Sequence, residues 1–261
     1  MTKIIAVTNQ KGGVGKTTTS VNLSASLVAT RRRVLLIDLD PQGNATMGSG
    51  VDKRALELST HDVLLGDAGL DAAVVRETRG GYHLLAANGD LTAAEVGLLE
   101  VEGRETRLRT ALAGAQEVYD YIIIDCPPAL NMLTVNALTA ADTVMIPMQC
   151  EYYALEGLTA LLDTIRRIQA HLNPELEVEG LLRTMYDPRN RLATDVSHQL
   201  TEHFGGKVYR TVIPRNVRLA EAPSYGLPVL AYDKGSRGAQ SYLALAGEML
   251  RNERAAEKQP A

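Results

Sequence analysis

Short apolar segments alternate along the chain with longer stretches in which apolar side chains recur at helical spacing. The segments 4–7, 33–38 and 119–125 are short and rich in branched aliphatic residues, which is typical of strands buried on both faces. Between the first two, residues 17–28 have the spacing of a helix. A strand, a helix and a second strand in this order form a βαβ unit and predict a parallel sheet.

The same alternation continues through the rest of the chain. Further strands are predicted at 82–86, 143–147, 177–184 and 207–213, and further helices at 155–172 and 238–251. Residues 91–116 also have helical spacing, interrupted near Gly103. The pattern predicts an α/β fold with a mostly parallel, twisted sheet flanked by helices on both faces. We expect residues 1–251 to form a single domain and the polar residues 252–261 to form a flexible C-terminal tail.

Composition narrows the class of protein. The chain has 261 residues, of which 45% are hydrophobic, enough for one large core. Its apolar runs all fall short of the roughly 20 residues that span a membrane, and no signal peptide is evident. Its two cysteines, Cys126 and Cys150, lack the spacing of a metal site, so a reducing cytoplasm is the simplest interpretation.

A glycine-rich segment directly follows the first predicted strand. The triplet Gly15-Lys16-Thr17 matches the second half of a P-loop, in which backbone N–H groups at a helix N-terminus bind phosphate. We expect Lys16 to reach the β- and γ-phosphates of ATP and the Thr17 hydroxyl to ligate Mg²⁺. The alternative is a glycine-rich turn with a solvated lysine, but the strand–loop–helix context favours the P-loop.

This P-loop departs from the ordinary pattern. Gln10 stands where the first glycine belongs, and an additional lysine, Lys11, lies inside the loop before Gly12 and Gly13.

Acidic residues end two of the predicted strands. Asp38 and Asp40 follow the second strand and would face the crevice where α/β sheets bind ligands. Turn-forming aspartates are the alternative, and Pro41 and Gly43 predict an irregular loop after them. Asp125 ends another apolar strand, as in a Walker B motif, and is expected to hold Mg²⁺ beside Thr17, through a water molecule.

The charge of the chain is unevenly distributed. The net charge of −4 excludes a globally basic nucleic-acid-binding protein. Residues 183–218, however, contain seven Lys/Arg against three Asp/Glu, and a local basic face can contact phosphates nonspecifically despite an acidic total.

In combination, these motifs resemble those of ParA/Soj-type chromosome- or plasmid-partitioning ATPases, the deviant Walker A group of P-loop NTPases. The matching segments are 11–18, 34–46, 122–128 and 213–226. The resemblance implies a P-loop NTPase-like fold, magnesium-dependent hydrolysis of ATP, and roles for individual residues. The nucleotide-binding positions it implies are Lys11, Gly12, Gly13, Val14, Gly15, Lys16, Thr17, Thr18, Pro214 and Asn216.

Within that set, Lys11 resembles the family's signature lysine, which touches the partner's nucleotide in an ATP-sandwich dimer. Gly12 matches the position where two P-loops approach, so a side chain there should obstruct dimer closure. Asp40 matches the aspartate that orients the attacking water, and Asp38 is expected to be structural or to act in the outer sphere of the metal. Lys11, Lys16 and Asp40 are therefore the expected catalytic residues.

The resemblance also implies partners. Arg189 and Arg218 match positions that contact DNA in similar proteins, although a solvated surface charge is the alternative for each. ATP binding would then drive homodimerisation and nonspecific binding of double-stranded DNA. Hydrolysis, stimulated by a ParB-type centromere-binding protein, would release the DNA. The expected location is cytoplasmic and nucleoid-associated, with no membrane partner.

Other classes of ATPase remain alternatives. A MinD-like membrane-cycling ATPase would need a C-terminal amphipathic helix with a large apolar face, which residues 251–260 lack. A nucleotide-dependent electron carrier like the nitrogenase iron protein would need cysteines that bridge a cluster, and neither cysteine fits well. Deviant Walker A ATPases that position other cargoes share the same core and stay open.

Overall fold

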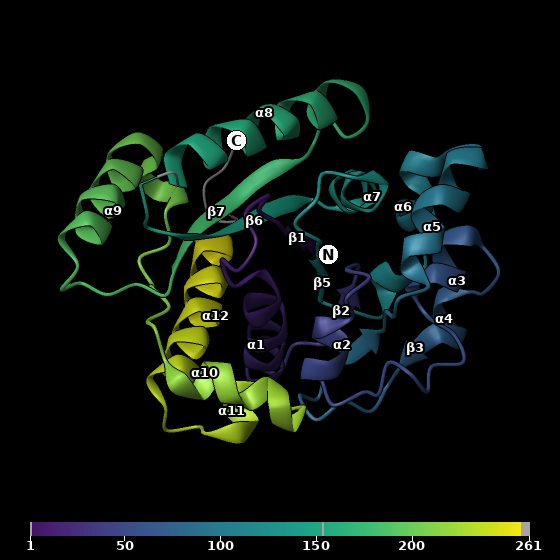
Figure 1. Ribbon diagram of the computed structural model, residues 1–261, viewed down its shortest axis with the longest axis horizontal. Coiled ribbons are helices and arrows are strands. Elements are labelled where there is room, and N and C mark those ends of the chain that lie inside the picture. The colour runs from purple at the N-terminus through teal and green to yellow at the C-terminus, as the bar shows by residue number, and fades with distance from the viewer. Residues whose placement is uncertain (1, 153, 257–261) are drawn as a thin grey trace.

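A seven-stranded sheet forms the centre of the computed structural model, which describes residues 2–152 and 154–256 (Figure 1). The order across the sheet is β3-β4-β2-β5-β1-β6-β7, and every neighbouring pair is parallel except β3 with β4. The strands are β1 (Lys3–Val7), β2 (Val34–Asp38), β3 (Val74–Val75), β4 (His83–Leu85), β5 (Tyr121–Asp125), β6 (Thr143–Gln149) and β7 (Glu177–Thr184).

The central strands are buried because helices cover both faces of the sheet (Figure 1). In β1, Ile4 and Ala6 belong to the core on one face, whereas Ile5 and Val7 belong to the core on the other. This alternation follows from the period of two in a strand. It explains why these strands are continuous apolar runs in the sequence.

The helices divide between the two faces. Helices α1, α2, α10, α11 and α12 bury apolar residues on the face with Ile5, and the remaining helices do so on the face with Ile4. Their bounds are α1 (Lys16–Ala29), α2 (Asn44–Gly48), α3 (Thr60–Leu65), α4 (Leu70–Ala73), α5 (Leu91–Gly97), α6 (Arg107–Ala111), α7 (Met132–Ala140), α8 (Ala154–His171), α9 (Arg191–Phe204), α10 (Val217–Glu221), α11 (Val229–Tyr232) and α12 (Arg237–Ala256). Short 3₁₀ turns are η1 (Leu98–Glu100), η2 (Arg104–Thr106), η3 (Ala115–Glu117), η4 (Gly205–Lys207) and η5 (Ala222–Tyr225).

The α/β fold with a mostly parallel sheet and helices on both faces is confirmed. Three local predictions were wrong. Residues 207–213 do not form a strand: Lys207 ends η4, and Val208 makes only an isolated bridge to Leu181. The loop after Asp40 gives way to helix α2 at Asn44, after a turn through Gly43 at φ +60°.

The third concerns the C-terminal end. Helix α12 continues to Ala256, past residue 251, where the sequence predicted the flexible tail to begin; residues 257–261 lie outside the described residues. Within the part of the chain that the structure describes, no helix is long and apolar enough to cross a membrane.

Candidate functional site

The P-loop connects β1 to α1 at the carboxyl edge of the sheet. Gly13 and Gly15 adopt φ values of +74° and +90°, which side-chain-bearing residues rarely adopt. Helix α1 begins at Lys16, and Gly15 supplies no side-chain cap for its first N–H groups. The first turn of α1 therefore offers backbone donors to an anion.

Lys16 lies at the start of this helix and is only 7% exposed. Its Nζ donates a hydrogen bond to the carbonyl oxygen of Lys11, at 3.2 Å, which folds the ammonium back over the loop. Burial lowers the pKa of Lys16, and the nearby Asp125 partly opposes this effect. The ammonium thus lies in a dehydrated position, where a phosphate group is a strong electrostatic partner.

Thr17, in the first turn of α1, lies beside Asp125, the last residue of β5. The Thr17 hydroxyl donates to Asp125 Oδ2 at 2.7 Å, and Ser20 Oγ donates to Asp125 Oδ1 at 2.9 Å. Burial, with repulsion from Asp38, raises the pKa of Asp125 to about 8. A nearby cation would favour its charged form. A hydroxyl and a carboxylate are hard oxygen donors, so this pair fits Mg²⁺ that takes its other ligands from phosphate and water.

Among the described residues, no group of three or more His, Cys, Asp or Glu side chains could hold a metal ion by itself. In nucleotide sites, Mg²⁺ usually takes some of its ligands from the bound phosphates rather than from the protein alone.

Asp38 and Asp40 have different surroundings in the loop after β2. Asp38 is fully buried and accepts hydrogen bonds from Thr46 N, Thr46 Oγ1 and Asp40 N. Burial raises its pKa to about 6. These bonds fix the course of the loop, which supports the prediction that Asp38 is structural. Within the described residues, the Asp40 carboxylate accepts one hydrogen bond, from the N–H of Gln42 to Oδ1 at 2.9 Å, so most of its acceptor sites are not used to hold this loop.

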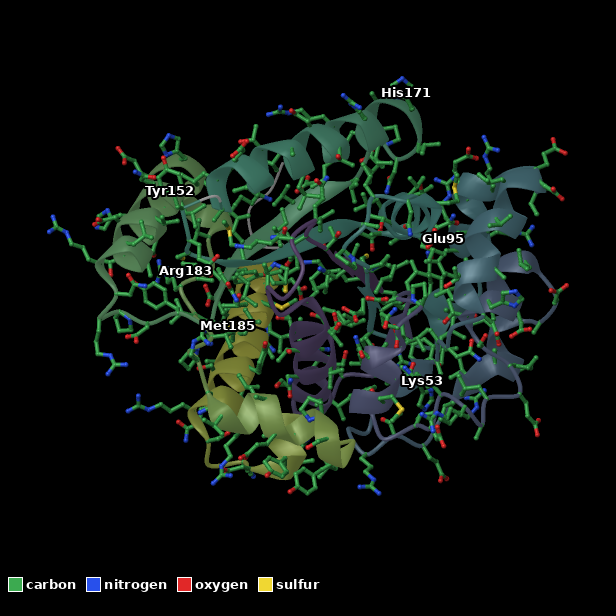
Figure 2. All side chains as sticks on the ribbon, viewed as in Figure 1. Lys53, Glu95, Tyr152, His171, Arg183 and Met185 are labelled. Atoms are coloured by element: carbon green, nitrogen blue, oxygen red, sulfur yellow. The ribbon has the colours of Figure 1, made fainter. Side chains whose placement is uncertain are left out.

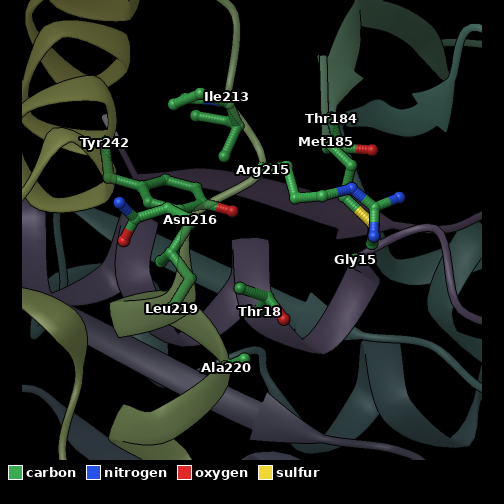
Figure 3. Close-up of a pocket in the computed structure, with 11 residues that line it drawn as sticks. Gly15, Thr18, Thr184, Met185, Ile213, Arg215, Asn216, Leu219, Ala220 and Tyr242 are labelled. Carbon is green, nitrogen blue, oxygen red and sulfur yellow. The ribbon is translucent and has the colours of Figure 1, made fainter. Parts of the chain in front are cut away.

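A cavity of about 180 Å³ lies beside the P-loop (Figure 3). Pro214 and Asn216 line it together with Gly15 and Thr18, so these four predicted positions lie around one cavity. The buried Asn216 Oδ1 has no hydrogen-bond partner in the described structure. A buried acceptor without a partner is costly, and this one lies toward α12, where a Cβ atom built on Gly238 would stand 3.1 Å from it.

Several residues of this cavity were not identified from the sequence. Thr184 ends β7 and Met185 follows it directly. Tyr242 comes from α12, where its hydroxyl pairs with that of Thr19 of α1 at 3.1 Å. In Figure 3 the Arg215 side chain extends toward Gly15. Met185 has a φ of +49°, an unusual backbone conformation for a residue with a side chain. Thr184, Met185 and Tyr242 belong to no local motif, because strand register and the packing of α12 against α1 bring them to the P-loop.

Comparison with known proteins agrees with this geometry. A family model described as an AAA domain matches residues 2–178. The sporulation initiation inhibitor protein Soj of Bacillus subtilis is 54% identical, over 97% of this chain and 100% of its own. The chromosome partitioning protein ParA of Caulobacter vibrioides is 50% identical, over 97% of this chain and 95% of its own. The chain belongs to the ParA/Soj family of partitioning ATPases.

Solved structures of similar fold contain nucleotide and magnesium. A cobyrinic acid a,c-diamide synthase from Mycobacterium smegmatis, with bound ADP and magnesium, has a TM-score of 0.86 and 42% identity, covering 100% of this chain and 99% of its own. The same protein is also known with a bound ATP analog and magnesium. A fold similar to this one therefore holds the kind of ligand that the arrangement of Lys16, Thr17 and Asp125 fits.

The two residues that distinguish the ParA/Soj-type loop are exposed. Lys11 forms an ion pair with Glu151, which follows β6, and 44% of the Lys11 side chain is exposed. A Cβ atom built on Gly12 would have no neighbour within 4 Å, and the φ of Gly12 is not in the left-handed region. Nothing in the described protomer therefore requires glycine at position 12.

The two arginines expected to contact DNA lie on the surface of the ParA/Soj-type fold. Arg189, between β7 and α9, pairs with Asp187 at 2.8 Å. Arg218, in α10, pairs with Glu221 at 2.7 Å and Asp233 at 3.3 Å. Arg183 from the same basic window instead binds Ser197 Oγ and the carbonyl of Tyr209, so it holds the fold together rather than adding to a basic surface (Figure 2).

Proposed function

We propose that this protein is an ATP-dependent DNA-segregation ATPase. ATP binding drives formation of a sandwich dimer that binds DNA nonspecifically, and hydrolysis, stimulated by a ParB-type protein, releases the DNA. The protein would act in the cytoplasm on the nucleoid. One observation carries this proposal: Lys11 is exposed, and the next residue is a glycine that its own protomer does not require. Both features are accounted for if a second P-loop approaches this surface.

The residues of one protomer have separable tasks in this proposal. Lys16 neutralises the β- and γ-phosphates from its buried position, and the first turn of α1 donates backbone N–H groups to them. Thr17 and Asp125 would hold Mg²⁺, which supplies positive charge to the phosphates when it is bound. Pro214 and Asn216 would bind the base in the adjoining cavity.

Hydrolysis needs positioning and charge neutralisation more than covalent chemistry. Asp40 would orient the attacking water in line with the leaving oxygen, because its carboxylate is largely uncommitted beside the P-loop. Lys11 of the partner subunit would add positive charge where negative charge develops on the γ-phosphate. Because that lysine comes from the second copy, dimerisation and hydrolysis are linked.

DNA binding would follow from the symmetry of the dimer. Each copy contributes Arg189 and Arg218, so dimerisation doubles the number of possible phosphate contacts. Affinity for DNA and its salt dependence both rise with that number. Opening of the dimer after hydrolysis would return the protein to weak binding.

Co-sedimentation with DNA tests the proposal. Wild-type protein should sediment with nonspecific duplex DNA in ATP, but not in ADP or without nucleotide, and retention should fall steeply between about 50 and about 200 mM salt. Equal retention in all three nucleotide states would contradict it. A parallel sample with anionic liposomes addresses the MinD-like alternative, since ATP-dependent sedimentation with lipid and not with DNA would favour membrane cycling.

A further inference from the structure

Two carbonyl groups of the P-loop accept hydrogen bonds from side chains outside the loop. Thr184 Oγ1 donates to the carbonyl of Val14 at 2.7 Å, and Gln149 Nε2 approaches the carbonyl of Gly13 at 3.3 Å. Thr184 is the last residue of β7, and Gln149 is the last residue of β6. The two are register partners in the parallel pair β6–β7, so adjacent side chains at one sheet edge reach consecutive carbonyls.

The geometry of the peptide bond turns this contact into a constraint on the nucleotide site. In a planar trans peptide, the C=O of one residue and the N–H of the next point in opposite directions. Holding the Gly13 carbonyl toward the sheet edge therefore turns the Val14 N–H away from it, and holding the Val14 carbonyl does the same for the N–H of Gly15. These are the donors that a P-loop offers to phosphate.

The hydrogen bonds from Thr184 and Gln149, which we call the clamp, are needed because the loop contains glycines. Gly13 and Gly15 lie at positive φ, and glycine has many other conformations available to it. Without an external partner, the peptides between them could rotate at little cost, and the N–H groups would no longer converge. Thr184 is 3% exposed, so its hydrogen bond is shielded from competing water.

The same strand ends connect the phosphate and base sites. Gln149 Nε2 also approaches Met185 Sδ at 2.8 Å. Both Thr184 and Met185 line the cavity beside the P-loop (Figure 3). We propose that Thr184 and Gln149 are positioning residues of the nucleotide site, which fix the orientation of the P-loop peptides toward the β-phosphate. The proposal rests on the nucleotide-binding part of the proposed function and concerns residues outside the sequence motif.

The test compares binding of ADP and AMP to Thr184→Val. Valine keeps the branched shape of threonine but has a methyl group in place of the hydroxyl, which leaves the Val14 carbonyl without its donor. We expect the affinity for ADP to fall by about tenfold or more, since an unpaired buried acceptor is costly. AMP, which has no β-phosphate, should lose much less, so the preference for ADP over AMP should narrow. Thr184→Ser, which keeps the hydroxyl, should restore ADP binding to within about threefold of wild type.

Matched controls separate positioning from stability. Thr139, on α7, is 1% exposed, and its hydroxyl has no hydrogen-bond partner in the described structure, so Thr139→Val makes the same substitution away from the loop. Its ADP affinity should be unchanged. If Thr184→Val does not fold, as judged by thermal unfolding, Gln149→Met tests the Gly13 carbonyl from a less buried position and should weaken ADP more than AMP.

Two outcomes would overturn the clamp: wild-type ADP affinity in Thr184→Val, or an equal loss for ADP and AMP, which would assign Thr184 to the base cavity alone. Failure of the wild-type protein to bind ADP would instead contradict the proposed function itself.

Discussion

At the scale of single residues, Lys16 should contribute most to ATP binding. Its buried ammonium lies over the loop, and loss of a charged hydrogen-bond donor to phosphate should weaken ATP binding by about 10- to 100-fold. Lys16→Ala can be measured by fluorescence titration with a labelled ATP analogue. Lys234→Ala, which removes an exposed lysine, should bind as wild type does. Unchanged binding and turnover in Lys16→Ala would contradict the P-loop assignment.

Asp40 should affect turnover rather than binding. Asp40→Ala removes the carboxylate expected to orient water but leaves Lys16, Thr17 and Asp125 in place, so ATP should still bind. Hydrolysis should slow by at least about 100-fold, and the ATP-bound dimer should persist. Phosphate release and light scattering over time provide the measurements. A variant that stays monomeric in ATP, or hydrolyses at the wild-type rate, would refute this role.

The sequence predicted the residues that form local motifs. Gly15, Lys16 and Thr17 are consecutive, and their context of strand, loop and helix follows from hydrophobic pattern alone. Thr184 and Tyr242 could not be found in this way, because their proximity to the loop depends on strand register and on the packing of α12 against α1.

At the scale of elements, the segment after η4 shows how side chains complete an interrupted ladder. Tyr209 and Ile213 donate their N–H groups to the carbonyls of Leu181 and Arg183 in β7, at 3.1 and 2.9 Å. Residues 207–213 have the apolar pattern of a strand, yet Glu248 of α12 accepts the N–H groups of Arg210 and Thr211, at 2.7 and 2.9 Å. Arg183 donates to the carbonyl of Tyr209 from the other side. The hydrophobic periodicity indicates that this segment is buried, but it does not show which groups form hydrogen bonds with its backbone. The strands of the central sheet were predictable because they are buried on both faces.

Glu248 should therefore contribute to stability. It is 8% exposed, and Glu248→Ala leaves two backbone donors without their acceptor, so unfolding free energy should fall by about 1–3 kcal/mol at pH 7. Urea denaturation measures this, with the exposed Glu202→Ala as control. No difference between the two variants would show that this contact does not hold the segment.

The contribution of Glu248 should also depend on pH. Burial acts to raise its pKa, but the hydrogen bonds from Thr211 and Arg210 outweigh this and lower it below its ordinary value of 4.5. A carboxylate with a lowered pKa stabilises the fold above that ordinary value, and the stabilisation is lost as pH falls through the lowered one. The stability difference between wild type and Glu248→Ala should therefore narrow below pH 4.5.

At the scale of the whole molecule, DNA binding should depend on arginines that now pair with acids. Arg218 would exchange Glu221 and Asp233 for DNA phosphates. Arg218→Ala should weaken DNA binding and make its salt dependence shallower by about two units, one for each copy in a dimer. ATP-dependent dimerisation should be unaffected. Arg166→Ala, on α8, is the charge-matched control, and an equal effect of both variants would remove the case for a specific surface.

Dimerisation should also depend on Glu151, because Lys11 cannot both pair with it and reach across to a partner's nucleotide. An exposed ion pair contributes at most about 1 kcal/mol, and two such pairs break in each dimer. Glu151→Gln should therefore tighten ATP-dependent dimerisation by about 3- to 10-fold in sedimentation equilibrium. Glu156→Gln, an exposed acid at the start of α8, should not change it. Unchanged or weaker dimerisation in Glu151→Gln would show that the pair does not restrain Lys11.

We expect two copies of this chain to close on ATP through Lys11 and Gly12. Light scattering of the wild-type protein with a non-hydrolysable ATP analogue measures this most directly, with Gly12→Val beside it, because the protomer has room for that side chain. The wild-type protein should have twice the mass of one chain with the analogue and the mass of a single chain without nucleotide. Gly12→Val should have the mass of a single chain in both conditions. A wild-type protein that keeps the mass of a single chain in the analogue would contradict this expectation.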